Sequence, residues 1–256
     1  MKDIIMNLPS PLEIITDPIS IVILIMYAFI MLWEALFPAK VLPQVKYWKL
    51  KGFIAFTIFF FLSTYFPLIW DAYLIHFQIF DLSILGTYTG AFVALIIYEL
   101  GVYVWHRMMH RSNYLWRVFH QMHHSAERLD AYGAFYFSLM DMIGFTLLGS
   151  LCLVVIAGFT VEATTLFILI TTFLAIFQHS NIKTPKWIGY IIQRPESHSV
   201  HHGKGTHAYN YSDLSFIDMI FGTFKNPTHF YKETGFYNGA SNKVIEMFLF
   251  KDISQK

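Results

Sequence analysis

Long apolar runs dominate the first 180 residues and predict helices that cross a membrane. Such a helix needs about 20 apolar residues, with a range of roughly 17 to 25. Three runs reach this length, and a shorter pair joined by FTVE follows them. The runs cover residues 19–37, 52–70, 83–105, 142–158 and 163–178. The shorter pair fits either a tight spanning hairpin or two helices that enter the membrane partway. We therefore expect an all-α integral-membrane protein with about four to five transmembrane helices, forming one domain over residues 1–256.

Positive charges collect between these runs and predict the orientation of the chain. Lys and Arg are absent from residues 52–105 and 129–182. They form three groups: Lys40, Lys46, Lys49 and Lys51; Arg107, Arg111, Arg117 and Arg128; and those from Lys183 onward. Short loops rich in Lys and Arg stay on the cytoplasmic side. Five crossings, or three with a re-entrant hairpin, place all three groups on that side and only Lys2 on the other. The acidic residues among the first eighteen argue against a secretory signal.

Composition agrees with a membrane protein and excludes some functions. The chain is 55% hydrophobic and 14% charged, whereas a soluble domain is about a quarter charged. The net charge is +1 and no basic stripe stands out, so we expect no nucleic-acid partner. The single cysteine, Cys152, lies in an apolar run and favours a buried packing role.

Histidines form three clusters on the predicted cytoplasmic side: HRMMH at 106–110, HQMHH at 120–124 and HSVHH at 198–202. Spacings of three and four residues place side chains on one face of a helix. Imidazole is a ligand for iron, copper, zinc and nickel. A structural zinc is closed by four ligands, so nine histidines suit two ions with open positions. The candidate ligands are His106, His110, His120, His123, His124, His179, His198, His201 and His202.

Two further residues are candidates to support these ligands. Glu99 stands seven residues, or two helical turns, before His106, so we expect its carboxylate to orient a histidine ligand. His207 follows HSVHH closely and is an additional ligand or a supporting group. For Asp141, which opens the fourth run, a helix N-cap is the favoured interpretation. A haem held between histidines needs one histidine on each of two facing helices, and HxxHH clusters suit that poorly.

At these residues the chain resembles the fatty acid hydroxylase superfamily, also called the sterol desaturase family. The likeness lies in the three histidine boxes together with YELGVYVWHR, LWRVFHQMHHSAERLDA, FQHSN, RPESHSVHHG and NYSDLSFIDMIFGTF. It covers about residues 90–225, the expected catalytic region. It is closer to the bacterial members and the alkylglycerol monooxygenase-like branch than to eukaryotic sterol enzymes. One departure follows the second box, where many members have a histidine-proline pair and this chain has Ser138 and Leu139 in FYFSLMD.

The resemblance implies a membrane-bound non-haem oxygenase with two iron ions and O2 as co-substrate. Its substrate would be a lipid taken from the bilayer, such as a fatty acid, sterol or ether lipid, which is hydroxylated or desaturated. Electrons would come from a separate protein, a reductase, cytochrome or ferredoxin. The membrane would be the bacterial inner membrane or, in a eukaryote, the endoplasmic reticulum, with the histidine boxes in a cytoplasmic helical cap.

A membrane protein that binds or transports metal without catalysis is the alternative function. Transporters usually place ionisable ligands near the middle of the bilayer. The histidines here are predicted at helix ends, which favours the enzyme.

Overall fold

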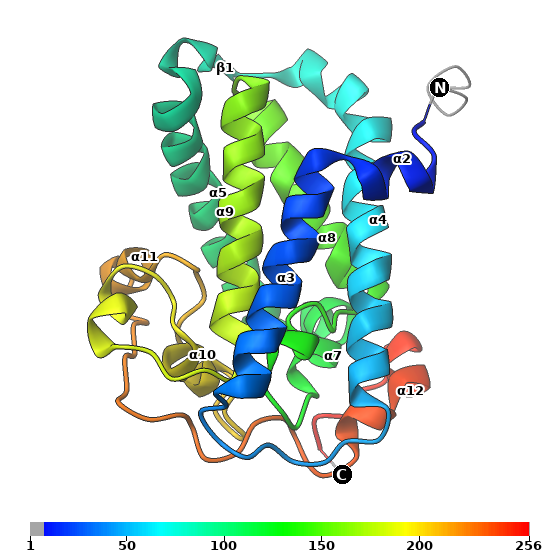
Figure 1. Cartoon of the computed structure of the whole chain (residues 1–256), viewed down its shortest axis with the longest axis vertical. Helices are drawn as coiled ribbons and strands as arrows, with labels where there is room; N and C mark the ends of the chain where they lie inside the picture. The colour runs from blue at the N-terminus through cyan, green and yellow to red at the C-terminus, as the bar shows by residue number, and fades with distance from the viewer. Residues whose placement is uncertain (1–7, 256) are drawn as a thin grey trace.

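The computed structural model describes residues 8–255 and is built almost entirely from helices (Figure 1). The predicted position of Lys2 lies outside the described residues. The long helices are α3 (Pro18–Leu36), α4 (Trp48–Leu74), α5 (Gly86–Arg111), α8 (Leu139–Ser150) and α9 (Val161–His179). The short ones are α2 (Pro11–Thr16), α6 (Asn113–Leu115), α7 (Gln121–His124), α10 (Pro195–His201), α11 (Ser215–Ile220) and α12 (Val244–Phe248).

Five helices of the described chain are long and apolar enough to cross a membrane. They correspond to the five predicted runs, so the all-α membrane fold is confirmed. The first helix of the shorter predicted pair is longer than α8 alone, because a π-helical segment, Leu151–Ile156, continues it. The two helices of the pair then have 18 and 19 residues. Both have the length of a spanning helix.

The long helices lie side by side, with the small elements at the two ends of the bundle (Figure 1). Helix α9 packs against α3 and α5, and α4 packs against α8. At one end, strands β1 (Phe80–Asp81) and β2 (Ala157–Gly158) pair in parallel and join the connections after α4 and α8. At the opposite end lie α7, α10, α11 and α12. The chain segments with the three basic groups belong to this second end.

Glu34, near the end of α3, fixes two of the segments at this end of the bundle. Its carboxylate is buried and accepts hydrogen bonds from the backbone N–H groups of Ala131 and Asn181, both at 2.8 Å. Ala131 belongs to the connection after α7, and Asn181 directly follows α9. An acidic residue inside an apolar helix thus holds together segments that are far apart in sequence.

A close approach of α4 to the same connection requires glycine at position 52. A Cβ atom at Gly52 would overlap the backbone carbonyl of Tyr132. Nearby, the indole Nε1 of Trp48 donates to Asp130 at 2.8 Å. The connection after α7 is therefore pinned from both α3 and α4, which fixes the position of the second histidine box.

Candidate metal centre

Segments far apart in sequence bring nine histidines to the same end of the bundle. The box 106–110 lies in the last turns of α5, and His179 is the last residue of α9. The box 120–124 spans the end of a π-helical segment and α7, while the box 198–202 lies on α10 and the residue after it. Eight of these histidines are buried and His110 is half-buried. A π-helical turn beside a cluster of ligand-type residues is typical of a functional site.

The nine side chains form two separate clusters of nitrogen atoms. Within each cluster, one nitrogen from every histidine lies within 4.8 Å of the others, a geometry that could hold a metal ion. The five-histidine cluster consists of His106, His110, His120, His124 and His201. The four-histidine cluster consists of His123, His179, His198 and His202. The clusters are adjacent, since the rings of His124 and His202 stack with their centroids 4.2 Å apart.

The two HxxHH boxes contribute to these clusters in opposite ways. In HQMHH the first and last histidines, four residues apart, belong to the five-histidine cluster, and the middle one belongs to the four-histidine cluster. In HSVHH the first and last histidines belong to the four-histidine cluster, and the middle one to the other. Each box therefore bridges both clusters. The sequence spacing indicated a shared helix face but not this division.

Backbone carbonyl groups orient two ligands of the five-histidine cluster. The Nδ1 of His106 lies 2.8 Å from the carbonyl oxygen of Tyr211, and the Nδ1 of His201 lies 2.7 Å from that of Tyr209. A carbonyl oxygen can only accept a hydrogen bond. Both Nδ1 atoms therefore carry the proton, and each Nε2 presents a lone pair to the cluster.

One histidine of each cluster is oriented in the same way by the long helices. The Nδ1 of His120 lies 2.8 Å from a carboxylate oxygen of Asp141 in α8. The Nδ1 of His179 lies 2.6 Å from the carbonyl oxygen of Ala175, one turn earlier in α9. Both contacts leave Nε2 free to act as a ligand atom.

The free nitrogens face one another at distances that call for a cation between them. The Nε2 atoms of His106 and His120 are 2.9 Å apart, although both are unprotonated when Nδ1 donates. The Nε2 of His179 is 3.0 Å from that of His123 and 3.0 Å from that of His198. Facing lone pairs repel, and a buried acceptor without a donor is costly. The donor set therefore fits metal ions.

Further nitrogens of the clusters are also unsatisfied. Buried atoms without a hydrogen-bond partner include the Nε2 atoms of His110, His124 and His201. Burial lowers the pKa of His123, His124 and His201 well below the usual histidine value, and the neighbouring imidazoles lower it further. Neutral imidazole is the form that binds a metal. The site thus holds its ligands in the state that coordination requires.

The segment 209–213 positions its carbonyl groups through an unusual backbone. Tyr209 and Asn210 have φ angles of 69° and 49°, the left-handed region. The Asn210 side chain supports this conformation, because its amide donates to the carbonyl oxygens of Ser197 and Lys225. The carboxylate of Asp218 also accepts from the backbone N–H of residue 211 at 2.9 Å. These contacts therefore hold in place the carbonyl groups of Tyr209 and Tyr211 that orient two histidines.

Glu99 supports the site differently from the prediction. Its buried carboxylate accepts from the hydroxyl of Ser212 and from the backbone N–H of Asp213, both at 2.8 Å. Among the described residues no hydrogen bond joins Glu99 to a histidine. It lies beside the segment that follows Tyr211, whose carbonyl oxygen contacts His106. Glu99 does lie on the same helix as His106, two turns earlier, but its carboxylate contacts the loop at Ser212 and Asp213 and not a histidine.

Asp141 and Ser138 have roles that the sequence interpretation did not assign. The N-cap of α8 is Ser138, whose hydroxyl accepts from the backbone N–H of Asp141 at 3.1 Å and donates to the carbonyl of Phe119 at 2.8 Å. The N-cap interpretation of Asp141 is therefore wrong, because its carboxylate contacts His120 instead. The signal available in the sequence was SLMD, a cap residue followed three positions later by an acid.

His207 lies beside the five-histidine cluster and outside both clusters. Its Nδ1 is 3.1 Å from the Nδ1 of His124, on the side of that ring away from the unpartnered Nε2. Burial lowers the pKa of His207 to about 4. This contact corresponds to the predicted supporting group more closely than to an additional ligand. The two remaining histidines, His76 and His229, are exposed.

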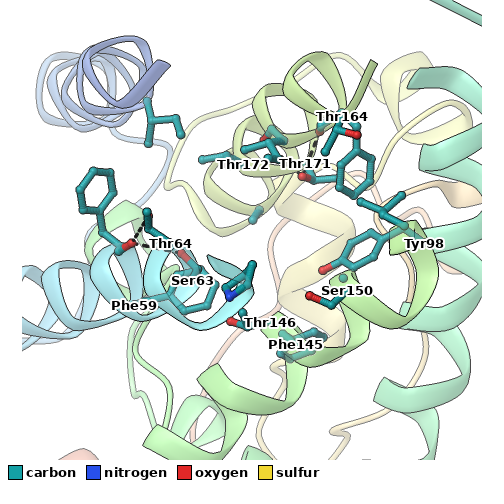
Figure 2. A pocket seen from close by; sticks show the side chains of 18 of the residues that line it. Phe59, Ser63, Thr64, Tyr98, Phe145, Thr146, Ser150, Thr164, Thr171 and Thr172 are labelled. Atoms are coloured by element: carbon teal, nitrogen blue, oxygen red, sulfur yellow. Dashed lines mark hydrogen bonds between the residues drawn. The ribbon is translucent and has the colours of Figure 1, made fainter. Parts of the chain in front are cut away.

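A cavity of about 1350 Å³ opens from the histidines into the helical bundle. At the histidine end it is lined by His106, His120, His123, His179 and His198. Figure 2 shows side chains of the four helices α4, α5, α8 and α9 facing this space, among them Phe59, Tyr98, Phe145 and Thr172. A drug-sized ligand typically occupies about 300 to 1,000 Å³. The cavity therefore has room for a long molecule that reaches the clusters.

Comparison with known proteins gives two kinds of match. A sequence profile of the family described as fatty acid hydroxylase matches residues 91–223. An ornithine lipid hydroxylase of Rhizobium tropici is 30% identical over 162 residues, covering 61% of this chain and 47% of the relative. Sphinganine C4-monooxygenase 1 of Arabidopsis thaliana is 24% identical over 157 residues, covering 60% of each chain. The matched region thus spans about half the length of these relatives. No solved structure matches.

Proposed function

Because this chain belongs to the fatty acid hydroxylase family, we propose that it is a membrane-bound non-haem di-iron oxygenase that hydroxylates a lipid. The observation that carries the proposal is the pair of histidine clusters at one end of a large cavity between membrane-spanning helices. Hydroxylation is favoured over desaturation because the two matched relatives are named as a hydroxylase and a monooxygenase.

Each cluster would hold one iron ion through imidazole nitrogens. The five-histidine cluster and the four-histidine cluster would supply nine imidazole ligands in all, a ligand type that suits iron. Iron bound there would supply the activation of O2 and the removal of hydrogen from an unactivated C–H bond. An all-histidine set of neutral ligands is also soft enough for copper or zinc, so the identity of the metal is a central point of the test.

The residues of the chain would supply orientation and a dry reaction space. The carbonyl groups of Tyr209 and Tyr211 and the carboxylate of Asp141 fix which nitrogen of each ring faces the metal. The rings of Phe137 and Phe145 pack on the cavity side of the histidines, with centroids 4.5 Å from His123 and 6.3 Å from His120. These side chains would exclude water and hold an alkyl chain against the metal centre.

The same arrangement supports a lipid substrate, an external electron donor and a cytoplasmic position of the histidines. The cavity lies between helices that face a bilayer, so a substrate would enter from the lipid. The basic groups after α3, α5 and α9 lie at the histidine end, and positive residues favour the cytoplasmic side. An external reductase, cytochrome or ferredoxin would then deliver electrons from the cytoplasm.

Metal analysis of the purified full-length chain tests the proposal directly. We expect about two irons per chain, together with a product that carries one oxygen atom from O2 when lipid extract and a reducing system are supplied. His123→Ala and His201→Ala, one from each cluster, should lose iron and activity together. His229→Ala removes an exposed histidine outside both clusters and is the matched control. Full turnover in either cluster variant would contradict the assignment of that ligand.

Metal binding without catalysis is the competing function. It predicts a metal content that follows the supply of zinc or copper in the growth medium and no oxygen transfer under any reducing condition. Iron content that stays near two per chain across media, with oxygen transfer, separates the enzyme from this alternative.

A further inference from the structure

The cavity continues from the histidines to the opposite end of the bundle, where its polar groups do not belong to the metal centre. Its lining there includes Asp71, Gln78, Asp81 and Ser150. Ser150 lies nine positions after Asp141 in α8, and Asp141 contacts His120. At about 1.5 Å per residue this distance is roughly 14 Å along the helix. The cavity thus has two chemically different ends.

The middle of the cavity presents hydrogen-bond acceptors. The hydroxyl of Thr64 donates to the carbonyl oxygen of Phe60 at 2.8 Å, and that of Thr146 donates to Met142 at 2.7 Å. Thr64 and Thr146 lie on the neighbouring helices α4 and α8, and both line the pocket (Figure 2). Each hydroxyl proton is used in a hydrogen bond within its own helix, so the remaining lone pairs of the hydroxyl oxygen can only accept hydrogen bonds. A ligand that carries hydrogen-bond donors would therefore interact favourably with these two hydroxyl oxygens.

The far end adds a carboxylate in which one of the two oxygens lacks a partner. The Oδ1 atom of Asp71 is buried and has no hydrogen bond. The carboxylate lies beside Ser150, whose hydroxyl already accepts from the indole Nε1 of Trp70 at 2.7 Å. An unpaired buried carboxylate oxygen is costly, and a donor from a ligand would remove that cost. Asp71 is therefore the strongest attachment point outside the metal centre.

Charge at this end favours a cation over an anion. The acidic residues of the lining here are Glu13, Asp17, Asp71 and Asp81, and no Lys or Arg of the described chain lines the cavity. Glu13 and Asp17 cap helices α2 and α3, and Asp81 accepts from the backbone N–H of Ser83 at 3.0 Å. Of these four residues, only Asp71 has a buried carboxylate oxygen without a hydrogen bond. A carboxylate or phosphate head would meet repulsion, whereas an ammonium would be attracted.

We propose that Asp71 and Ser150 form a binding site for the ammonium or hydroxyl group of an amphiphilic lipid, whose alkyl chain runs through the cavity to the histidines. A C–C bond of about 1.5 Å advances an extended chain by roughly 1.25 Å, so 14 Å corresponds to about eleven carbons. The polar group would then determine which carbon reaches the metal centre. The direction in which the alkyl chain of the lipid runs rests on the proposed function. The binding site at Asp71 is argued independently of that function.

The test measures binding of three probes with the same saturated chain: hexadecylamine, hexadecanol and hexadecanoate. The full-length chain in nanodiscs is used both with iron and after chelation. We expect the amine to bind most tightly and the carboxylate most weakly. Asp71→Asn should weaken amine binding about tenfold or more, the size of a lost charge-assisted hydrogen bond. Ser150→Ala should weaken it less, and provides a second variant if Asp71→Asn folds poorly.

Asp81→Asn is the matched control, because it removes an acidic charge at the same end whose carboxylate already has a partner. It should change amine affinity by less than about twofold. Tightest binding of hexadecanoate, or equal amine affinity in the wild type and Asp71→Asn, would overturn the proposal. Mapping the oxidised carbon is a separate measurement. Selective amine binding without oxidation would leave this site standing and reject the proposed enzyme activity.

Discussion

The Nε2 atoms of His106 and His120 face each other at 2.9 Å, although the Nδ1 atoms of both rings are held by oxygen acceptors. Two unprotonated nitrogens at this distance repel unless a cation binds to both. The two residues come from different helical segments, so the fold itself brings the lone pairs together. Metal binding would therefore raise the stability of the folded protein in addition to any catalytic role, because a metal ion that binds only the folded state stabilises that state.

Metal removal should therefore destabilise the protein. At a free metal concentration about 100 times the Kd, bound metal contributes about 2.7 kcal/mol. For a chain of this size that corresponds to a fall in Tm of roughly 5 to 10 °C on chelation. Thermal unfolding in detergent, before and after chelation and after the return of iron, measures it. His229→Ala should respond like the wild type, and a Tm that does not recover with iron would contradict the expectation.

The metal-free protein should lose stability as the pH falls below about 6.5. Burial lowers the pKa of His123, His198 and His202 well below the usual value. The unfolded chain then binds more protons than the folded chain at mildly acidic pH, so protonation favours unfolding. Above pH 7 both states are neutral and this contribution is fully present. Urea unfolding of chelated protein from pH 8 to pH 5 measures the slope, and stability that rises on acidification would be inconsistent with it.

Asp141→Ala should weaken one metal site and leave the other. The substitution removes the acceptor that orients His120, and loss of such a partner typically lowers metal affinity by about 10- to 100-fold. At limiting iron, metal content should fall from about two toward about one per chain, because the four-histidine cluster has no contact with Asp141. Asp252→Ala, an exposed carboxylate, is the control. Loss of both ions in Asp141→Ala would show that the two clusters do not bind independently.

Glu99→Ala should destabilise the protein much more than Glu99→Gln. Alanine leaves the Ser212 hydroxyl and the Asp213 N–H without an acceptor, at a cost of about 2 to 4 kcal/mol. Glutamine keeps an oxygen that can accept both. Chemical unfolding of the two variants provides the comparison. Equal destabilisation by both would mean that the charge of Glu99, and not its hydrogen bonding, holds the segment 209–213.

Ser138→Ala should cost about 1 kcal/mol of stability, the usual effect of losing an N-cap. Ser138 stands where many relatives have a histidine, yet its hydroxyl caps α8 and bonds to the carbonyl of Phe119. We therefore expect metal content in this variant to remain at the wild-type value. A fall in metal content without a fall in stability would assign Ser138 to the site itself.

The sequence predicted the helices and the residues of the site because both depend on local patterns. Apolar runs of membrane length and spacings of three and four residues are visible without tertiary contacts. The division of each HxxHH box between two clusters was not visible, because it depends on how α7 and α10 pack against α5 and α9. The role of Glu99 was misassigned for the same reason: helical spacing gives the direction of a side chain but not what lies opposite.

The sequence by itself determined an all-α membrane protein with a histidine-rich end. A bilayer requires long apolar helices, and the spacing of the histidines is visible directly in the sequence. Only the tertiary structure decided which nitrogen of His106, His120 and His201 faces the interior of the cluster. Carbonyl groups of Tyr209 and Tyr211, held in a left-handed segment, and the carboxylate of Asp141 fix those tautomers. The contact between His106 and Tyr211 joins residues 105 positions apart, so it follows from packing and no local signal in the sequence encodes it.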